Sequence, residues 1–106
     1  MKLGRIKQRL MDFRIFRGLC KYHTPERLAN AIMLEAGEIG QLFQWGKIPN
    51  KDSVSDEIAD VIIYCIYLSD KFNIDIEEAI FSKIEKNELK YPVDADNIKN
   101  NGWNIK

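Results

Sequence analysis

The stretch Ser53–Leu68, SVSDEIADVIIYCIYL, decides the fold of this chain. From Ile58 onward, its apolar residues occupy nearly the whole circumference of a helix rather than one stripe. Such a helix must be covered on more than one side, and a chain of 106 residues has few other elements to cover it. The sequence therefore predicts a central helix, capped by Ser53 and reaching about Phe72, that also packs against another subunit.

Helical periodicity indicates three further helices, over residues 4–21, 25–45 and 76–90. The first is predicted from an apolar stripe that comprises Ile6, Leu10, Phe13, Arg17 and Cys20. Thr24 followed by Pro25 is a strong start signal for the second helix. Pro92 ends the last helix, because proline disfavours helix at the residue before it. The predicted class is all-α, a four-helix bundle in one domain over residues 1–92, followed by a polar tail over residues 93–106.

Composition narrows the classes of partner. Sixteen basic and sixteen acidic residues balance, so no bulk field draws the chain to nucleic acid or to an anionic membrane. The longest wholly apolar run, Val61–Leu68, has eight residues, whereas a membrane span needs about 20. Cys20 and Cys65 lie far apart in helical segments, which favours reduced thiols and a cytoplasmic location.

Two pairs of carboxylates stand among the most apolar residues of the chain. Glu35 falls in the middle of a helical stripe, with Glu38 at its edge; the apolar members of that stripe are Leu28, Ala31, Ile32, Ile39 and Leu42. Glu57 and Asp60 repeat the three-residue step at the start of the central helix. Carboxylates are rarely buried without a partner, so two such pairs predict a shared cation.

The ligand chemistry favours magnesium. Four carboxylates brought together by two packed helices would repel one another, and a hard divalent cation relieves that repulsion. An all-oxygen site suits Mg²⁺, or Mn²⁺, better than zinc or copper. A di-iron bundle would need Glu-x-x-His motifs, and the chain, with His23 as its one histidine, contains none.

Enzymes that act on phosphates commonly use Mg²⁺ bound by carboxylates, and other residues of this chain are suited to binding a phosphorylated substrate. Lys83 and Asn87 are one turn apart on the fourth helix, where Lys83 can neutralise a phosphate and Asn87 can bond a phosphate or sugar oxygen. Trp45 can stack on a base, although an indole covering a core edge is the commoner role. No glycine-rich phosphate loop is present, which excludes the common nucleotide-binding folds.

The chain resembles the MazG-like all-α nucleoside triphosphate pyrophosphohydrolases, and among them the small dCTP pyrophosphatase type. The resemblance covers about residues 17–93. It is carried by HTP at 23–25, EAGE at 35–38, FQW at 43–45, EIADVIIY at 57–64, KIEKN at 83–87 and KYP at 90–92.

The resemblance implies a hydrolase that converts a (d)NTP to a (d)NMP and pyrophosphate. It implies that the Mg²⁺ ligands are Glu35, Glu38, Glu57 and Asp60. It also implies a substrate pocket that includes His23, Trp45, Tyr64, Lys83 and Asn87. A homodimer, or a homotetramer built from dimers, is expected, with the site near the subunit junction. Glu38 is our candidate for the carboxylate that orients or deprotonates the attacking water.

Substrate preference stays open at this stage. The dCTP-type relatives have a Trp and a His where this chain has Leu19 and Leu10, which favours house-cleaning of noncanonical dNTPs as much as a strict preference for dCTP. Two alternatives remain: a non-enzymatic helical dimerisation module, and a phosphoribosyl-ATP or dUTP hydrolase of the same superfamily.

Overall fold

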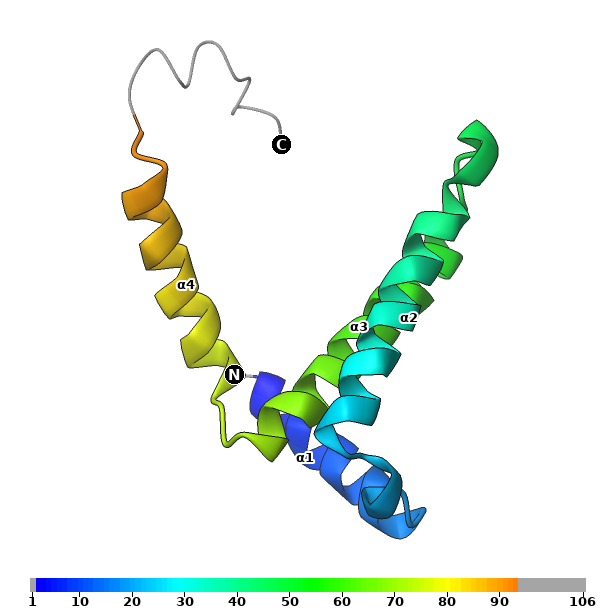
Figure 1. Ribbon diagram of the computed structural model, residues 1–106, viewed down its shortest axis with the longest axis vertical. Helices are drawn as coiled ribbons and strands as arrows, with labels where there is room; N and C mark the ends of the chain where they lie inside the picture. Colours follow the sequence, from blue (N-terminus) through cyan, green and yellow to red (C-terminus); the bar gives the residue numbers. More distant parts are fainter. Residues whose placement is uncertain (1, 94–106) are drawn as a thin grey trace. The chain divides into compact units, whose positions relative to one another are not determined.

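A computed structural model describes residues 2–93. Within that range the chain forms four α-helices and no strand: α1 (Lys2–Phe16), α2 (Pro25–Leu42), α3 (Lys51–Lys71) and α4 (Ile76–Lys90) (Figure 1). The all-α prediction is confirmed. None of the described helices is long and apolar enough to span a membrane. The tail predicted over residues 93–106 lies, except for Val93, outside the described part of the chain.

The starts of α2 and α3 are set by capping side chains. The Thr24 hydroxyl accepts a hydrogen bond from the backbone N–H of Arg27 at 3.2 Å, and Pro25 occupies the first position of α2, as predicted. For α3 the predicted cap is wrong. The Asn50 side chain accepts from the N–H of Ser53 at 2.8 Å, so the helix begins two residues earlier than Ser53.

Both α1 and α2 end earlier than predicted, and a residue with positive φ follows each of them. Gly18 has φ of 63°, and the N–H of Leu19 donates to the carbonyl of Arg14 at 2.9 Å, which is the Schellman pattern that closes a helix. The first helix therefore stops at Phe16 and not at residue 21. The second stops at Leu42, and a short 3₁₀ turn follows in which Trp45 has φ of 68°.

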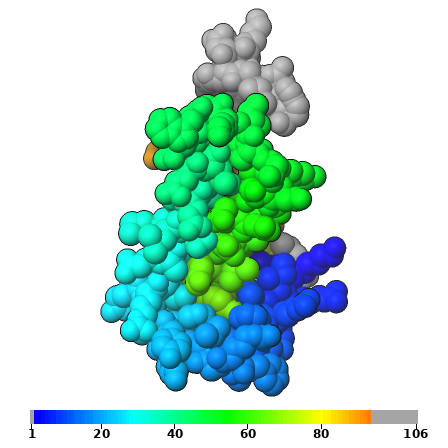
Figure 2. Space-filling view, turned by 90° about the vertical axis from the view of Figure 1, so that its right-hand side faces the viewer, coloured from blue at the N-terminus to red at the C-terminus, as the bar shows by residue number. Residues whose placement is uncertain are grey.

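The described residues fall into two compact units, one that ends at Asp75 and one that begins at Ile76. In the first unit, α2 and α3 lie side by side along their length (Figure 1). The residues of α1 gather at one end of this pair (Figure 2). The most deeply buried apolar side chains are Leu28, Ile66 and Tyr67, so the core lies where α2 and α3 meet near α1.

An ion pair between the buried Arg14 and the half-buried Asp70 joins α1 to α3. Arg14 is buried, and its Nη2 atom lies 3.0 Å from Oδ2 of Asp70. The Tyr67 hydroxyl donates to the backbone carbonyl of Leu10 at 3.0 Å. The stripe predicted for the first helix is therefore largely wrong: of its five residues only Leu10 is half-buried, because Arg14 and not Phe13 faces α3.

The second unit contains α4, which has no buried residue within its bounds. The predicted end at Lys90 is confirmed. Ile80 and Ile84 are exposed in this unit.

Candidate metal centre

The inward face of α2 is the one that the sequence predicts. Glu35 is half-buried. Among its predicted apolar neighbours, Leu28 is buried, and the others are half-buried: Ala31, Ile32, Ile39 and Leu42. The opposite face is exposed at Glu26, Asn30, Gly37, Gly40 and Gln41. The helical period therefore places one carboxylate in the apolar stripe, directed at α3.

Carboxylates from α2 and α3 converge. One oxygen each from Glu35, Glu57 and Asp60 lie within 4.8 Å of one another. Glu38 belongs to the same group, because its carboxyl group hydrogen-bonds to that of Glu57. All four predicted carboxylates thus meet between two adjacent helices of one chain.

This convergence raises two pKa values. The hydrogen bond with Glu38, then burial, and then repulsion from Glu38, Glu35 and Asp60 raise the pKa of Glu57 to about 7. Burial, followed by repulsion from Glu38 and Asp60, raises the pKa of Glu35. The cluster therefore shares a proton near neutral pH, and this proton reduces its negative charge.

A divalent cation fits this donor set. The Oε2 atom of Glu57 is buried and has no hydrogen-bond partner among the described residues. Such an atom is costly in an ionised carboxylate unless a cation or a proton compensates it. Oxygen donors within 4.8 Å of one another on two rigid helices match the ligand type that Mg²⁺ and Mn²⁺ accept.

The other predicted site residues lie elsewhere on the chain. Tyr64 is half-buried, one turn beyond Asp60 on the same side of α3. His23 packs against Tyr67, with 4.5 Å between the ring centroids. Tyr67 is seven residues beyond Asp60, about 10 Å along the axis of α3. Trp45 is exposed beyond the end of α2.

Burial, then the charges of Arg14 and Lys71, lower the pKa of His23. This histidine is therefore predominantly neutral at pH 7. Lys83 and Asn87 are both exposed, one turn apart on α4, in the other unit. The roles of His23, Trp45, Tyr64, Lys83 and Asn87 stay predictions.

A pH titration of stability tests the coupling within the cluster. The pKa of Glu57 rises on folding from 4.5 to about 7, so the folded chain binds its proton more tightly than the unfolded chain. This contribution to stability is complete below about pH 4.5 and is lost as the pH rises through 7. Without metal, the wild type should lose stability relative to a Glu57→Gln variant between pH 5 and 8.

The comparison between the two proteins isolates Glu57. His23, whose pKa is lowered, contributes a change of opposite sign below pH 6.5, and this change cancels in the difference. Thermal unfolding followed by circular dichroism at constant ionic strength gives the two curves. A difference in melting temperature that does not vary with pH would contradict the shared proton.

Similar proteins were found by sequence and by structure. The chain is 32% identical over 83 residues to dCTP pyrophosphatase 1 of Mus musculus, and 32% identical over 82 residues to dCTP pyrophosphatase 1 of Homo sapiens. These matches cover 69% and 68% of this chain but 49% and 48% of the two relatives. The chain thus spans about half the length of the curated relatives it matches.

A solved structure has the same fold. A pyrophosphatase from Archaeoglobus fulgidus DSM 4304 superposes with a TM-score of 0.81 at 39% sequence identity. The superposition covers 88% of this chain and 94% of that one. Residues 26–104, which include the converging carboxylates, match the MazG-like family. The chain therefore belongs to the MazG-like family.

Proposed function

We propose that this chain is a Mg²⁺-dependent nucleoside triphosphate pyrophosphohydrolase that converts a (d)NTP to a (d)NMP and pyrophosphate. The observation that carries the proposal is the convergence of oxygens from Glu35, Glu57 and Asp60 within 4.8 Å of one another. The carboxyl group of Glu38 forms a hydrogen bond with that of Glu57. Membership of the MazG-like family supports it, as do relatives named pyrophosphatases.

In this proposal Glu35, Glu38, Glu57 and Asp60 hold the metal. When bound, Mg²⁺ polarises phosphate oxygens and offsets the charge that develops on the leaving pyrophosphate. The rigid helices α2 and α3 fix the carboxylates in advance, so little reorganisation is needed when a triphosphate arrives. Glu38 is exposed, and its carboxylate orients a water molecule and accepts its proton.

The remaining predicted residues bind the nucleotide. Lys83 neutralises phosphate charge, and Asn87 and Tyr64 contact phosphate or sugar oxygens. His23 and Trp45 contact the nucleoside. Leu10 and Leu19, which replace polar and aromatic residues of the dCTP-type relatives, are both half-buried. We therefore propose that modified or noncanonical dNTPs are among the substrates. We also propose that the protein acts in the cytoplasm, where its two cysteines would stay reduced.

A substrate panel tests this function. Each canonical dNTP and NTP, together with several modified dNTPs, is incubated with the protein and Mg²⁺, and pyrophosphate and orthophosphate are measured separately. Pyrophosphate in equal amount to a nucleoside monophosphate is the expected product. Orthophosphate as the product would contradict the bond assignment. Absence of turnover, together with no effect of Mg²⁺ on the melting temperature, would favour a dimerisation module.

A further inference from the structure

The charges of this chain are segregated along its sequence. Residues 1–23 contain seven basic residues and one acidic residue, Asp12, so this segment has an excess of six positive charges. Residues 24–106 contain nine basic and fifteen acidic residues, and they have an excess of six negative charges. The zero net charge, which predicts no bulk attraction to nucleic acid, therefore conceals a local positive field around α1.

The basic residues of α1 divide between two faces. Lys7 and Arg14 lie on the side that packs against α3, and both pair with an aspartate there. Lys2, Arg5 and Arg9 are exposed and lie on the opposite side, within about 60° of one another around the helix axis. None of these three forms an ion pair with another residue in the described part of the chain. Their charges are therefore available to an anionic partner.

Exposed apolar side chains stand among these cations on the same side of α1. Phe16, Ile6 and Phe13 are 83%, 47% and 45% exposed. Asp12 lies just outside the arc that the cations and these side chains occupy, and it accepts a hydrogen bond from Gln8 at 3.0 Å. We call this surface the α1 face; its residues are Lys2, Arg5, Ile6, Arg9, Phe13 and Phe16.

The pairing of cations with aromatic rings continues past the end of α1. The Cζ atom of Arg17 lies over the ring of Phe13, 4.0 Å from its centroid. In the 3₁₀ turn η1 (Cys20–Tyr22), Nζ of Lys21 lies 5.2 Å from the ring centroid of Tyr22, which is 52% exposed. Aromatic rings and guanidinium planes are the surfaces on which proteins stack unpaired nucleobases.

The mixture of cations and aromatics on one side distinguishes between anionic partners. A helix that lies in a membrane surface has its basic residues on one side and its apolar residues on the other. In α1 the other side packs against α3, so the exposed side carries both kinds of residue. Such a mixture suits a single strand of nucleic acid, which exposes its phosphates and the faces of its bases together.

We propose that the α1 face binds single-stranded nucleic acid. Lys2, Arg5 and Arg9 contact phosphates, and Phe13 and Phe16 stack with bases. The fifteen residues of α1 are about 22 Å long, so the site covers a few nucleotides and its affinity depends strongly on salt. Binding requires no metal ion, so the inference is independent of the proposed pyrophosphohydrolase activity.

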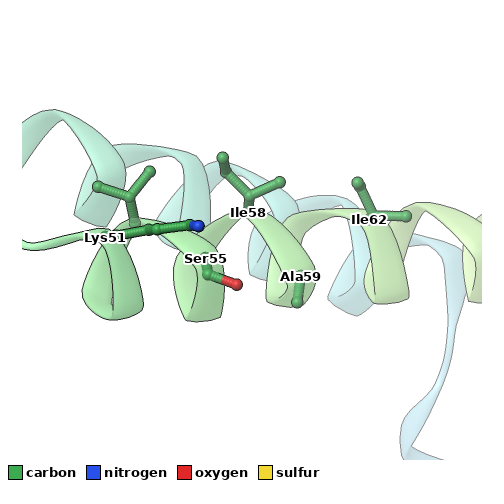
Figure 3. Close-up of a pocket in the computed structure, with 6 residues that line it drawn as sticks. Lys51, Ser55, Ile58, Ala59 and Ile62 are labelled. Atoms are coloured by element: carbon green, nitrogen blue, oxygen red, sulfur yellow. The ribbon is translucent and has the colours of Figure 1, made fainter.

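The α1 face is separate from the apolar surface of the central helix. An open groove follows the N-terminal half of α3, with Ile58 and Ile62 among its lining residues (Figure 3). The helix α1 instead contacts the C-terminal half of α3, where the Tyr67 hydroxyl donates to the carbonyl of Leu10. A contact made through the groove therefore does not involve residues of the α1 face.

Fluorescence anisotropy of a short labelled oligothymidylate, in EDTA and at low salt, tests the role of the cations. The logarithm of the binding constant should fall with the logarithm of salt concentration with a slope of about −2, since each phosphate contact to a single strand contributes about −0.7. Arg9→Glu should weaken binding at least tenfold and reduce the magnitude of this slope. Absence of binding by the wild type would overturn the proposal.

Lys86→Glu is the matched control for charge. Lys86 is exposed on α4, so this variant makes the same change of charge away from the α1 face and should bind as the wild type does. An equal loss of affinity in Arg9→Glu and Lys86→Glu would show that only net charge matters, and would overturn the assigned surface.

Phe16→Ala tests the stacking. The dissociation constant should rise at least fivefold, the effect of losing one stacked base, while the salt dependence stays that of the wild type. Phe81→Ala on α4, where Phe81 is 62% exposed, is the matched control and should bind normally. An unchanged affinity of Phe16→Ala, or equal affinity for a duplex of the same length, would overturn the stacking and with it the preference for single strands.

A variant that gains affinity guards against misfolding. Asp12→Asn removes the acidic group beside the α1 face and should lower the dissociation constant about twofold, which loss of structure cannot produce. Circular dichroism should show the helix content of the wild type in every variant. The rate of pyrophosphate release should be unchanged in Arg9→Glu, whose residue lies outside the carboxylate cluster. Weaker binding of Asp12→Asn would contradict the local positive field.

The identity of the anion is tested in parallel. The same titrations use an oligouridylate and vesicles that contain phosphatidylserine. Binding of either oligonucleotide supports the proposal, and the tighter of the two identifies DNA or RNA as the preferred strand. Binding to the vesicles without binding to either oligonucleotide would assign the α1 face to a membrane surface and overturn the proposal.

Discussion

Glu57→Gln and Asp60→Asn should each lower the rate of pyrophosphate release by more than about 100-fold. Loss of a residue that only orients a metal ligand already lowers metal affinity or activity by about 10–100-fold, and loss of a ligand itself should cost more. Both substitutions keep the size of the side chain and remove one negative charge. The oxygens of Glu57 and Asp60 lie within 4.8 Å of each other, so either change removes a donor from the proposed Mg²⁺ site. Turnover at several Mg²⁺ concentrations measures the effect.

Loss of activity should not come from loss of the fold. The hydrogen bond with Glu38, then burial, and then repulsion within the cluster raise the pKa of Glu57 to about 7, so removal of its charge should raise the metal-free melting temperature at pH 8. Mg²⁺ should stabilise the wild type by binding to the folded state, and this shift should be small in both variants. Activity and metal-free stability are therefore expected to change in opposite directions.

Asp56→Asn is the matched control. Asp56 precedes Glu57 on α3 and is exposed. Its replacement by Asn therefore removes one negative charge from the same helix, but outside the cluster. This variant should keep the wild-type rate and the Mg²⁺-dependent rise in melting temperature. If Asp56→Asn were as impaired as Glu57→Gln, the loss would reflect the charge of the helix, and the assignment of the metal ligands would be wrong.

The sequence predicted the carboxylate cluster because its determinants are local. Glu35 and its apolar neighbours follow the period of one helix, and the burial along α2 confirms this. The three-residue step from Glu57 to Asp60 likewise needs only the geometry of α3. Placing the two helices side by side added one assumption, that apolar faces pack together, and the contact between α2 and α3 bears it out.

Other features depend on contacts or conformations that periodicity does not encode. Arg14 and Asp70 are 56 residues apart, and no local pattern marks either as a buried partner. The apolar Phe13 next to Arg14 favoured the wrong face for α1. Gly18 was a visible signal for the end of α1, because a glycine readily adopts the positive φ that closes a helix. Trp45 gave no such signal, since bulky residues rarely have positive φ.

The ion pair that the sequence did not reveal should matter greatly to stability. The Arg14 side chain is 9% exposed, and its Nε and Nη1 atoms have no hydrogen-bond partner among the described residues, so Asp70 supplies its carboxylate contact at 3.0 Å. The hydrogen bond from Arg14 holds the pKa of Asp70 below its usual value. Asp70→Ala leaves a buried guanidinium uncompensated and should reduce the free energy of unfolding by about 3 kcal/mol.

Two companion variants separate charge burial from loss of contact. Lys7 lies 3.6 Å from Asp70 but is 43% exposed, so Lys7→Ala should cost less than about 0.5 kcal/mol. Adding Arg14→Met to Asp70→Ala removes the buried charge and should recover a large part of the lost stability, because an apolar side chain needs no counter-ion. Urea unfolding at one protein concentration gives the free energy of unfolding of Asp70→Ala, of Lys7→Ala and of the double variant. A double variant less stable than Asp70→Ala would show that the guanidinium stabilises α1 through its packing on Tyr67, 5.3 Å from the ring centroid, and not through its pairing with Asp70.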